Sequence, residues 1–147
     1  MSSIIVPCSA CGTKNRIPDM KQHQHPRCGK CKTPLQVKEC VVPVELSDAN
    51  MDNFIRDVNL PVIVDFFSPT CSPCTTLAPI LHKLTKKFFA KIVIATIDTS
   101  KNPGCSAHYK IKGVPTLIFF KNGEIVDQIT GLPDVAFLES KLKYLAG

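Results

Sequence analysis

The stretch that decides the fold is Val62-Ile63-Val64-Asp65-Phe66-Phe67 followed, four residues on, by Cys71-Ser72-Pro73-Cys74. The first segment is a nearly continuous apolar run, which is typical of a strand buried on both faces of a sheet. Apolar residues then repeat at helical spacing from the cysteines to Phe88. Two thiols separated by two residues, where a strand gives way to a helix, can close a disulfide and open it again. The stretch therefore predicts redox chemistry on an α/β scaffold.

Strand and helix patterns alternate on both sides of this stretch, and the order β-α-β-α-β-α-β-β-α predicts a mixed sheet with helices on both faces. Ser47 is a candidate N-cap of the first helix. Asn122-Gly123 predicts a two-residue hairpin turn before the last strand. We expect helices over 49–58, 72–89, 103–109 and 135–145, and strands over 62–67, 92–97, 116–120 and 124–130, while residues 38–46 are expected to be a short connection that runs into the first strand of the second domain.

Cys71 and Cys74 are the candidate catalytic residues. A helix that begins near residue 72 puts Cys71 at its N-terminus, where unpaired N–H groups and the helix dipole favour a thiolate. Cys71 is then the nucleophile and Cys74, one turn along, the resolving thiol, while Pro73 fixes a dihedral in the first turn. The competing interpretation, half of a metal site, lacks a second pair, because Cys40 and Cys105 are isolated in the sequence.

Asp65 places a carboxylate inside the apolar strand that leads to the cysteines. Burial of an unpaired charge is costly, so we expect a raised pKa and a role in moving the proton of Cys74. The alternatives are an exposed edge position or a hydrogen-bonded structural aspartate. Pro115, directly before a strand, is a further candidate because such a proline can follow a cis peptide bond.

Four other cysteines form two further pairs near the N-terminus. Cys8 and Cys11 are separated from Cys28 and Cys31 by sixteen residues, a spacing typical of a zinc site. Gly12 and Gly29 supply backbone freedom beside the pairs. Four thiolates complete a tetrahedron, which marks a structural site, and the segment has too few apolar residues to fold without such support. We interpret it as a zinc ribbon.

Other interpretations of this segment stay open. The same thiols can form two local disulfides, remain free or hold iron. We expect His23 and His25, between the pairs, to be exposed loop residues rather than ligands. Residues 1–40 carry a formal charge of +5, from seven basic and two acidic residues, which four thiolates on Zn²⁺ reduce to about +3. With no aromatic residue there to stack on bases, nucleic acid is a poor candidate partner.

We divide the chain into a zinc ribbon over residues 1–38 and a second domain over residues 39–147. No Gly/Ser-rich linker separates them, so we expect the ribbon to lie close to its neighbour. No apolar run approaches the roughly 20 residues that span a bilayer, and the N-terminus does not resemble a signal peptide. We therefore expect no membrane contact and a cytoplasmic protein.

Residues 41–147 resemble the thioredoxin family, and the four-cysteine extension resembles that of the family's zinc-ribbon-bearing bacterial type. The resemblance is carried by motifs in the family's order and spacing. These are Val64-Asp65-Phe66, Cys71-x-Pro73-Cys74, Ala78-Pro79, Asn102-Pro103, Gly113-Val114-Pro115-Thr116, Phe120-Lys121-Asn122-Gly123 and Gly131.

The resemblance implies a thioredoxin fold and a set of functional residues. Pro115 would be cis and face the disulfide, and Asp65 would assist proton transfer. It also implies one zinc ion in the ribbon, a redox-active disulfide, protein disulfides as substrates, a thioredoxin-reductase-like electron donor and a monomer. Residues implied to line the substrate groove are Thr70, Ser72, Pro73, Val114 and Gly131.

Three positions depart from the family pattern. The usual Trp-Cys-Gly-Pro-Cys has Thr70 and Ser72 in place of Trp and Gly, and the chain contains no Trp. Thr96 stands where a lysine is common near the buried aspartate. Because neighbouring residues set redox poise, the potential is expected to differ from the roughly −270 mV of thioredoxin.

We therefore expect a thiol-disulfide oxidoreductase that acts as a protein disulfide reductase. Two alternatives remain at this point. One is a zinc-dependent, redox-responsive chaperone or binding module, and the other is an oxidant or isomerase with a shifted potential.

Overall fold

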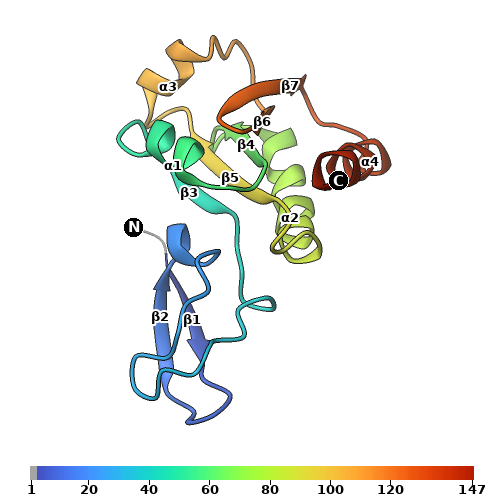
Figure 1. The fold of residues 1–147 in the computed structure, drawn as a ribbon. Coiled ribbons are helices and arrows are strands. Elements are labelled where there is room, and N and C mark those ends of the chain that lie inside the picture. Colours follow the sequence, from blue (N-terminus) through green and yellow to red (C-terminus); the bar gives the residue numbers. More distant parts are fainter. Residues whose placement is uncertain (1–2) are drawn as a thin grey trace.

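A computed structural model describes residues 3–147 and places a small ribbon beneath a larger α/β domain (Figure 1). The ribbon holds the hairpin of β1 and β2 and a single 3-10 turn, η1. The strands are β1 (Ser3–Pro7), β2 (Lys14–Pro18), β3 (Val44–Leu46), β4 (Val62–Phe67), β5 (Val93–Asp98), β6 (Thr116–Lys121) and β7 (Glu124–Thr130). The helices are η1 (Asp19–Lys21), α1 (Met51–Asp57), α2 (Ser72–Lys87), α3 (Pro103–His108) and α4 (Val135–Ala146).

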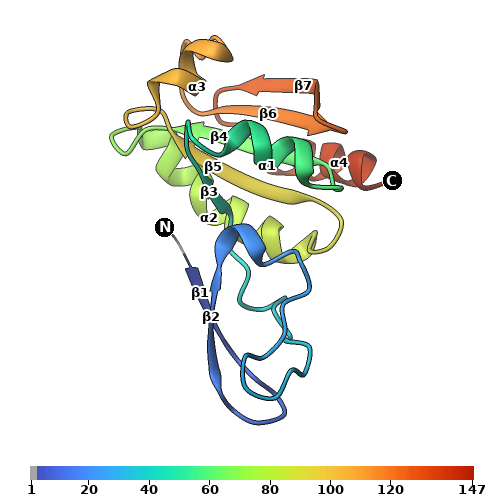
Figure 2. The same cartoon turned by 60° about the vertical axis from the view of Figure 1, so that its left-hand side comes forward.

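The larger domain is built on a five-stranded mixed sheet of order β3-β5-β4-β6-β7. β3, β5 and β4 run parallel, and β6 and β7 are antiparallel. One face packs against α1 and α3, and the other against α2 and α4 (Figure 2). The predicted fold class, element order and mixed sheet are confirmed, and β4 lies at the centre of the sheet.

The segment from β4 to α2 follows the sequence prediction closely. β4 spans Val62–Phe67, and α2 begins at Ser72. The turn between β6 and β7 is also as expected, because Asn122 and Gly123 both have positive φ, at 55° and 80°.

The predicted N-cap of the first helix is wrong. The helix begins at Met51 and its N-cap is Asn50. The Asn50 side chain accepts a hydrogen bond from the Ser47 N–H at 2.8 Å, and the Ser47 carbonyl accepts from Met51 N–H at 3.0 Å. Ser47 thus opens the turn that precedes the helix, and the helix starts later than predicted.

The ribbon and the start of the connector form a small hydrophobic cluster, made up of Ile4, Val6, Cys8, Ile17, Cys28, Leu35, Val37 and Val41. Eight buried residues are few for a segment of this length, which supports the inference that bound metal stabilises it.

Contacts along the connector hold the ribbon against the larger domain. Gln22 is fully buried and bonds both backbone groups of Val42, donating to its carbonyl and accepting from its N–H. The Asp19 carboxylate accepts a hydrogen bond from the Glu45 N–H at 2.7 Å. Lys86, on α2, donates to the Val41 carbonyl at 3.1 Å. The expectation of a closely held ribbon is confirmed.

His23 corrects a second prediction. It is not an exposed loop residue: both ring nitrogens are buried, without a hydrogen-bond partner among residues 3–147, and the ring lies 5.7 Å from that of Phe89. Burial lowers the pKa of His23 to about 4. His25 is exposed, as predicted. The difference arises because His23 faces the larger domain, a contact that local sequence does not encode.

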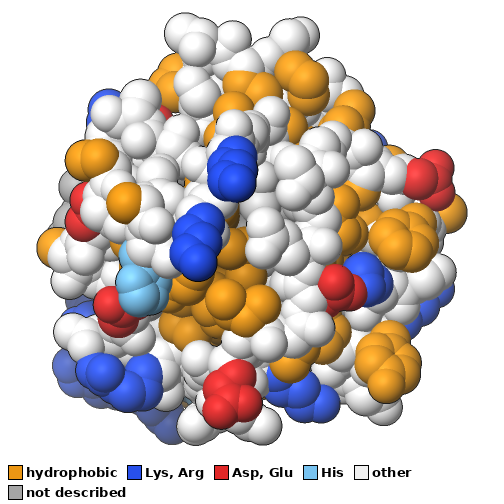
Figure 3. All heavy atoms as spheres, turned by 90° about the horizontal axis from the view of Figure 1, so that it is seen from above, with side chains coloured by type: hydrophobic (Ala, Val, Ile, Leu, Met, Phe, Trp, Pro, Cys, Tyr) orange, Lys and Arg blue, Asp and Glu red, His pale blue; other side chains and the backbone are white. Residues whose placement is uncertain are grey.

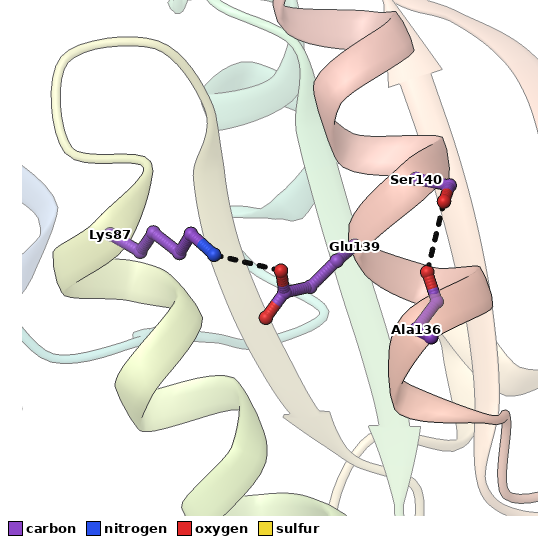
Figure 4. A network of polar contacts seen from close by, with 4 residues as sticks. All are labelled: Lys87, Ala136, Glu139 and Ser140. Carbon is purple, nitrogen blue, oxygen red and sulfur yellow. Dashed lines mark hydrogen bonds and ion pairs between the residues drawn. The ribbon is translucent and has the colours of Figure 1, made fainter.

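α2 and α4 lie side by side on the same face of the sheet. The Lys87 ammonium reaches the Glu139 carboxylate at 2.7 Å across this pair, and within α4 the Ser140 hydroxyl donates to the Ala136 carbonyl (Figure 4). Among residues 3–147, no helix combines the length and apolar character that crossing a membrane requires.

Candidate functional site

Cys71 and Cys74 form a disulfide at the start of α2, with their Cα atoms 5.2 Å apart. Cys71 is the N-cap of the helix, and its Sγ accepts a hydrogen bond from the Cys74 N–H at 3.2 Å. This is the position that the strand-to-helix pattern predicted. A backbone N–H directed at Sγ favours a thiolate when the disulfide is reduced.

The two sulfurs differ in their access to solvent. Cys74 is 4% exposed, whereas Cys71 is half-buried. Thr70, Ser72 and Pro73 are exposed around them. The arrangement leaves Cys71 as the thiol that an incoming disulfide can reach and keeps Cys74 behind it.

The loop before β6 faces the disulfide. The Val114–Pro115 peptide bond is cis, as the resemblance implied, and the Val114 carbonyl lies 3.6 Å from Cys71 Sγ. Gly131, with φ of 91°, donates its N–H to the Pro115 carbonyl at 2.8 Å. These residues, distant in sequence from the cysteines, therefore come together at one edge of the disulfide.

Asp65 lies in β4 on the face that α2 covers, and it is 3% exposed. Its Oδ1 has no hydrogen-bond partner in the described part of the chain. Burial raises the pKa of this carboxyl to about 7, as the sequence predicted in direction. Asp65 and Cys74 line the same cavity, of about 520 Å³, so the carboxyl and the inner thiol have a common space.

Sequence reasoning missed the other polar residues of this cavity. Glu45 of β3 and His82 of α2 line it, and so does Thr96, which pairs with Asp65 in the β4–β5 ladder. Thr96 was identified only as a departure from the family pattern, and its pairing confirms the position assigned to it. The signal for Glu45 lies in strand register, since β3 pairs with β5.

The remaining paired cysteines of the ribbon sit in two tight turns. In the first turn Gly12 N–H bonds the Cys8 carbonyl, and in the second Lys32 N–H bonds the Cys28 carbonyl. Gly12 has φ of 77° and Lys32 has φ of 65°. The expectation for Gly29 is wrong: the left-handed residue of the second turn is Lys32, which lies one position after the pair, as Gly12 does.

The four ribbon sulfurs converge on one point. All lie within 4.8 Å of one another, with Cys8 to Cys31 and Cys11 to Cys28 at 3.6 Å. Four sulfurs at about 2.3 Å from a central Zn²⁺ lie roughly 3.8 Å apart, so the cluster fits a tetrahedral ion. Hydrogen bonds, first from the Cys31 N–H, lower the pKa of Cys28 to about 6. Neither His23 nor His25 belongs to this cluster.

Cys40 and Cys105 belong to neither site. Cys40 is half-buried in the connector, and Cys105 is buried in α3. Burial raises the pKa of Cys105 to about 12, so its thiol stays protonated at neutral pH.

Comparison with known proteins covers both parts of the chain. The family model described as Thioredoxin matches residues 42–144, and the model described as Thioredoxin 2, N-terminal, a zinc ribbon, matches residues 7–33. Thioredoxin C-3 of Corynebacterium nephridii is 38% identical over 128 residues, which cover 87% of this chain and 86% of that protein. The thioredoxin of Synechocystis sp. is 36% identical over 102 residues, 69% of this chain and 95% of that protein.

A solved structure gives the same result for the fold. A mutant thioredoxin from Halobacterium salinarum NRC-1 superposes with a TM-score of 0.66 at 28% identity, covering 72% of this chain and 92% of that one. Family model, relatives and the disulfide at the start of α2 lead to one conclusion. The chain belongs to the thioredoxin family and is a thiol-disulfide oxidoreductase, a disulfide reductase by its relatives.

Proposed function

We propose that the protein reduces disulfides of other proteins with Cys71 as nucleophile, Cys74 as resolving thiol and Asp65 as the proton acceptor for Cys74. The observation that carries this proposal is the position of the two sulfurs: Cys71 caps α2 and is accessible, whereas Cys74 is 4% exposed and shares a cavity with Asp65. The neighbours of the two thiols therefore give them different tasks.

The cycle has two exchange steps. The Cys71 thiolate attacks one sulfur of the substrate disulfide, and the other sulfur leaves with the electron pair. Asp65, as carboxylate, takes the proton of Cys74, whose sulfur then attacks Cys71 Sγ. The mixed disulfide breaks, the second substrate thiolate leaves, and the enzyme is oxidised by two electrons.

The surface around the disulfide suits an extended protein segment. Val114 presents its carbonyl beside Cys71 Sγ, and we propose that Val114 and Gly131, with Thr70, Ser72 and Pro73, line the substrate groove. Seen from above, the end of the molecule that carries β7 shows hydrophobic side chains among basic, acidic and histidine side chains (Figure 3). Leu132, 47% exposed, follows Gly131 and extends the apolar surface.

Trapping of the mixed disulfide tests the assignment of the two thiols. A Cys74→Ser variant should hold a fluorescent disulfide peptide on Cys71, so that peptide anisotropy rises and stays high. In the unmodified protein the rise should be followed by a fall as Cys74 releases the peptide. Cys40→Ser, outside both sites, is the matched control and should behave as the unmodified protein does. Release at the normal rate from Cys74→Ser would refute the role of Cys74.

The proposal extends to the ribbon and to the setting of the enzyme. Residues 1–38 are proposed as a ribbon that holds one structural Zn²⁺ through Cys8, Cys11, Cys28 and Cys31, and residues 39–147 as the catalytic domain. A thioredoxin-reductase-like donor would restore the dithiol. Free thiols and thiolate-bound zinc persist in reducing compartments, which supports a cytoplasmic location, and we propose that the protein acts there as a monomer.

The reduction potential tests the direction of electron flow. Equilibration of the Cys71/Cys74 couple against glutathione should give a potential below about −200 mV, in the range of reductants. A value well above this would make the protein an oxidant or isomerase.

A further inference from the structure

Three polar side chains lie in one row across the sheet beneath the active site. Glu45 of β3 pairs with Thr96 of β5, and Thr96 pairs with Asp65 of β4. Paired residues on adjacent strands project on the same face, and the strands lie about 4.8 Å apart. The row therefore spans roughly 10 Å, from the edge of the sheet to its centre.

Burial along this row falls steadily from one end to the other. Asp65 is 3% exposed, Thr96 is half-buried, and Glu45 is exposed on the edge strand. All three line the cavity of about 520 Å³ that also reaches Cys74. A cavity of that size, whose wall includes these three polar side chains, has room for several waters beside them. The row thus joins an otherwise isolated carboxyl to the surface.

We propose that Thr96 and Glu45 form the route by which Asp65 exchanges protons with solvent. The inference rests on the role proposed above for Asp65, because the route has no function unless Asp65 accepts the Cys74 proton. Thr96 and Glu45 are positioning and relay residues, since neither is placed at the reacting sulfurs.

The proton balance of the second exchange step shows why a route is needed. Asp65 gains the proton of Cys74 as Cys74 attacks Cys71 Sγ, and the electron pair leaves on the substrate thiolate. Asp65 can take that proton only as a carboxylate, so a molecule in which Asp65 is already protonated must first lose its proton to solvent before Cys74 can attack. The Thr96 hydroxyl can accept one proton while donating another, directly or through cavity water, and the Glu45 carboxylate passes it to bulk solvent.

Other groups that face Asp65 are few. From α2, Cys74 and His82 line the cavity; from β3, Glu45; and from β5, the neutral Thr96. The β6 residue paired with Asp65 is the apolar Leu117. The His82 side chain is largely exposed to solvent. Its partial burial, together with the charge of Lys86, lowers the pKa of its imidazole. Glu45 is therefore the exposed carboxylate of the route.

The ribbon fixes the outer end of this row. The Asp19 carboxylate accepts the Glu45 N–H at 2.7 Å, and Ser3 of β1 lines the same cavity. The ribbon thus contributes to the wall of the space above Asp65.

Single-turnover release of a fluorescent peptide from Cys71 tests the route in the full-length protein. We compare Glu45→Gln and Thr96→Val with Glu124→Gln, which makes the same charge change on β7, the opposite edge strand. The first two should slow release about fivefold at pH 7 in dilute buffer, without slowing the initial attack. Added imidazole should restore the rate, because a small buffer base can carry the proton instead.

A second readout separates a relay from a merely structural effect. Carbon NMR titration of the Asp65 carboxyl should give the same raised pKa in Glu45→Gln as in Glu124→Gln, because burial raises it, so that slower release in Glu45→Gln does not come from an altered Asp65 environment. An Asp65→Asn variant should slow release more than either relay variant. Normal release in Glu45→Gln and Thr96→Val, with slow release in Asp65→Asn, would overturn the route alone. Normal release in Asp65→Asn would overturn the role of Asp65 itself, and the route with it.

Discussion

The chain uses the same spacing, Cys-x2-Cys, in the ribbon and at the start of α2, with different results. In the ribbon each pair sits in a tight turn and faces the other pair, so four sulfurs gather within 4.8 Å. At the start of α2 a single pair closes on itself. The residue spacing therefore sets the distance between two sulfurs, and the presence or absence of a facing pair determines whether they join a four-sulfur cluster or form a disulfide.

The surroundings of each site reinforce this difference. In the ribbon, four thiolates around the proposed ion would leave no open position for substrate. Cys71 instead has a helix N-terminus on one side and the Val114 carbonyl on the other, with Cys74 behind it. With the proposed zinc bound, the ribbon site would be closed and structural, whereas the disulfide is open on one side.

Metal removal should have the largest effect and should be confined to the ribbon. Structural zinc contributes on the order of 10 kcal/mol to such segments, and the ribbon core is small. Cys28→Ser, or chelation, should abolish hydrogen-exchange protection of amides in residues 4–37 while β4 and β5 stay protected. Cys40→Ser should change neither. Retention of protection without metal would show that the ribbon core suffices alone.

Replacement of Cys71 by Ser should give the reverse pattern. Disulfide reduction should be lost, because no other thiol reaches the substrate side of the site in the described part of the chain, while one zinc per chain remains bound. Metal analysis and reduction of a disulfide peptide check this, again with Cys40→Ser as control. Loss of zinc in Cys71→Ser would mean that the two sites are coupled more closely than their separate geometries indicate.

Asp65 adds a further difference between the disulfide site and the ribbon, because it makes the stability of the larger domain depend on pH. Its pKa is raised from 3.8 to about 7, so its contribution to folding is full below pH 3.8 and is lost as pH rises through 7. The free energy of unfolding should fall by about 4 kcal/mol between pH 4 and pH 8 on this account. Asp65→Asn should remove that fall, as measured by urea unfolding at several pH values.

The exposed carboxylate Asp57 provides the control for this measurement. Asp57→Asn should leave the pH dependence as it is in the unmodified protein. The same slope in Asp65→Asn would show that Asp65 is hydrated in solution and carries no raised pKa.

Local pattern was sufficient for the features that decide the chemistry. The apolar run of β4 predicts a central strand because both faces are covered, and the cysteines follow where the period changes. Ribbon spacing predicts the metal cluster because four thiols must meet at one ion. Asn122-Gly123 predicts the hairpin because both residues adopt positive φ readily.

Features that depend on neighbours distant in sequence were not predicted. The Glu45–Thr96–Asp65 row requires the register of three strands, and the burial of His23 requires the position of Phe89. None of these contacts is visible in local periodicity.

His23 offers the smallest effect and tests how firmly the ribbon sits on its neighbour. Its pKa is lowered from 6.5 to about 4 by burial, so the stability of the contact is full above pH 6.5 and is lost as pH falls toward 4. At pH 5.5 the cost should be about 1 kcal/mol. His23→Phe keeps the aromatic contact with Phe89 and removes the titration. Its stability relative to the unmodified protein should therefore be greater at pH 5.5 than at pH 7.5.

At each pH the free energy of unfolding of the unmodified protein is subtracted from that of the variant. The titration of Asp65, which acts in the opposite sense, is the same in both proteins and therefore cancels. His25→Phe, in the same loop but exposed, serves as the matched control and should give no pH-dependent difference. An equal difference at both pH values in His23→Phe would mean that the His23 ring is solvated in solution. The ribbon would then rest on the larger domain through Gln22, Asp19 and Lys86, and acid would leave the His23 contact unchanged.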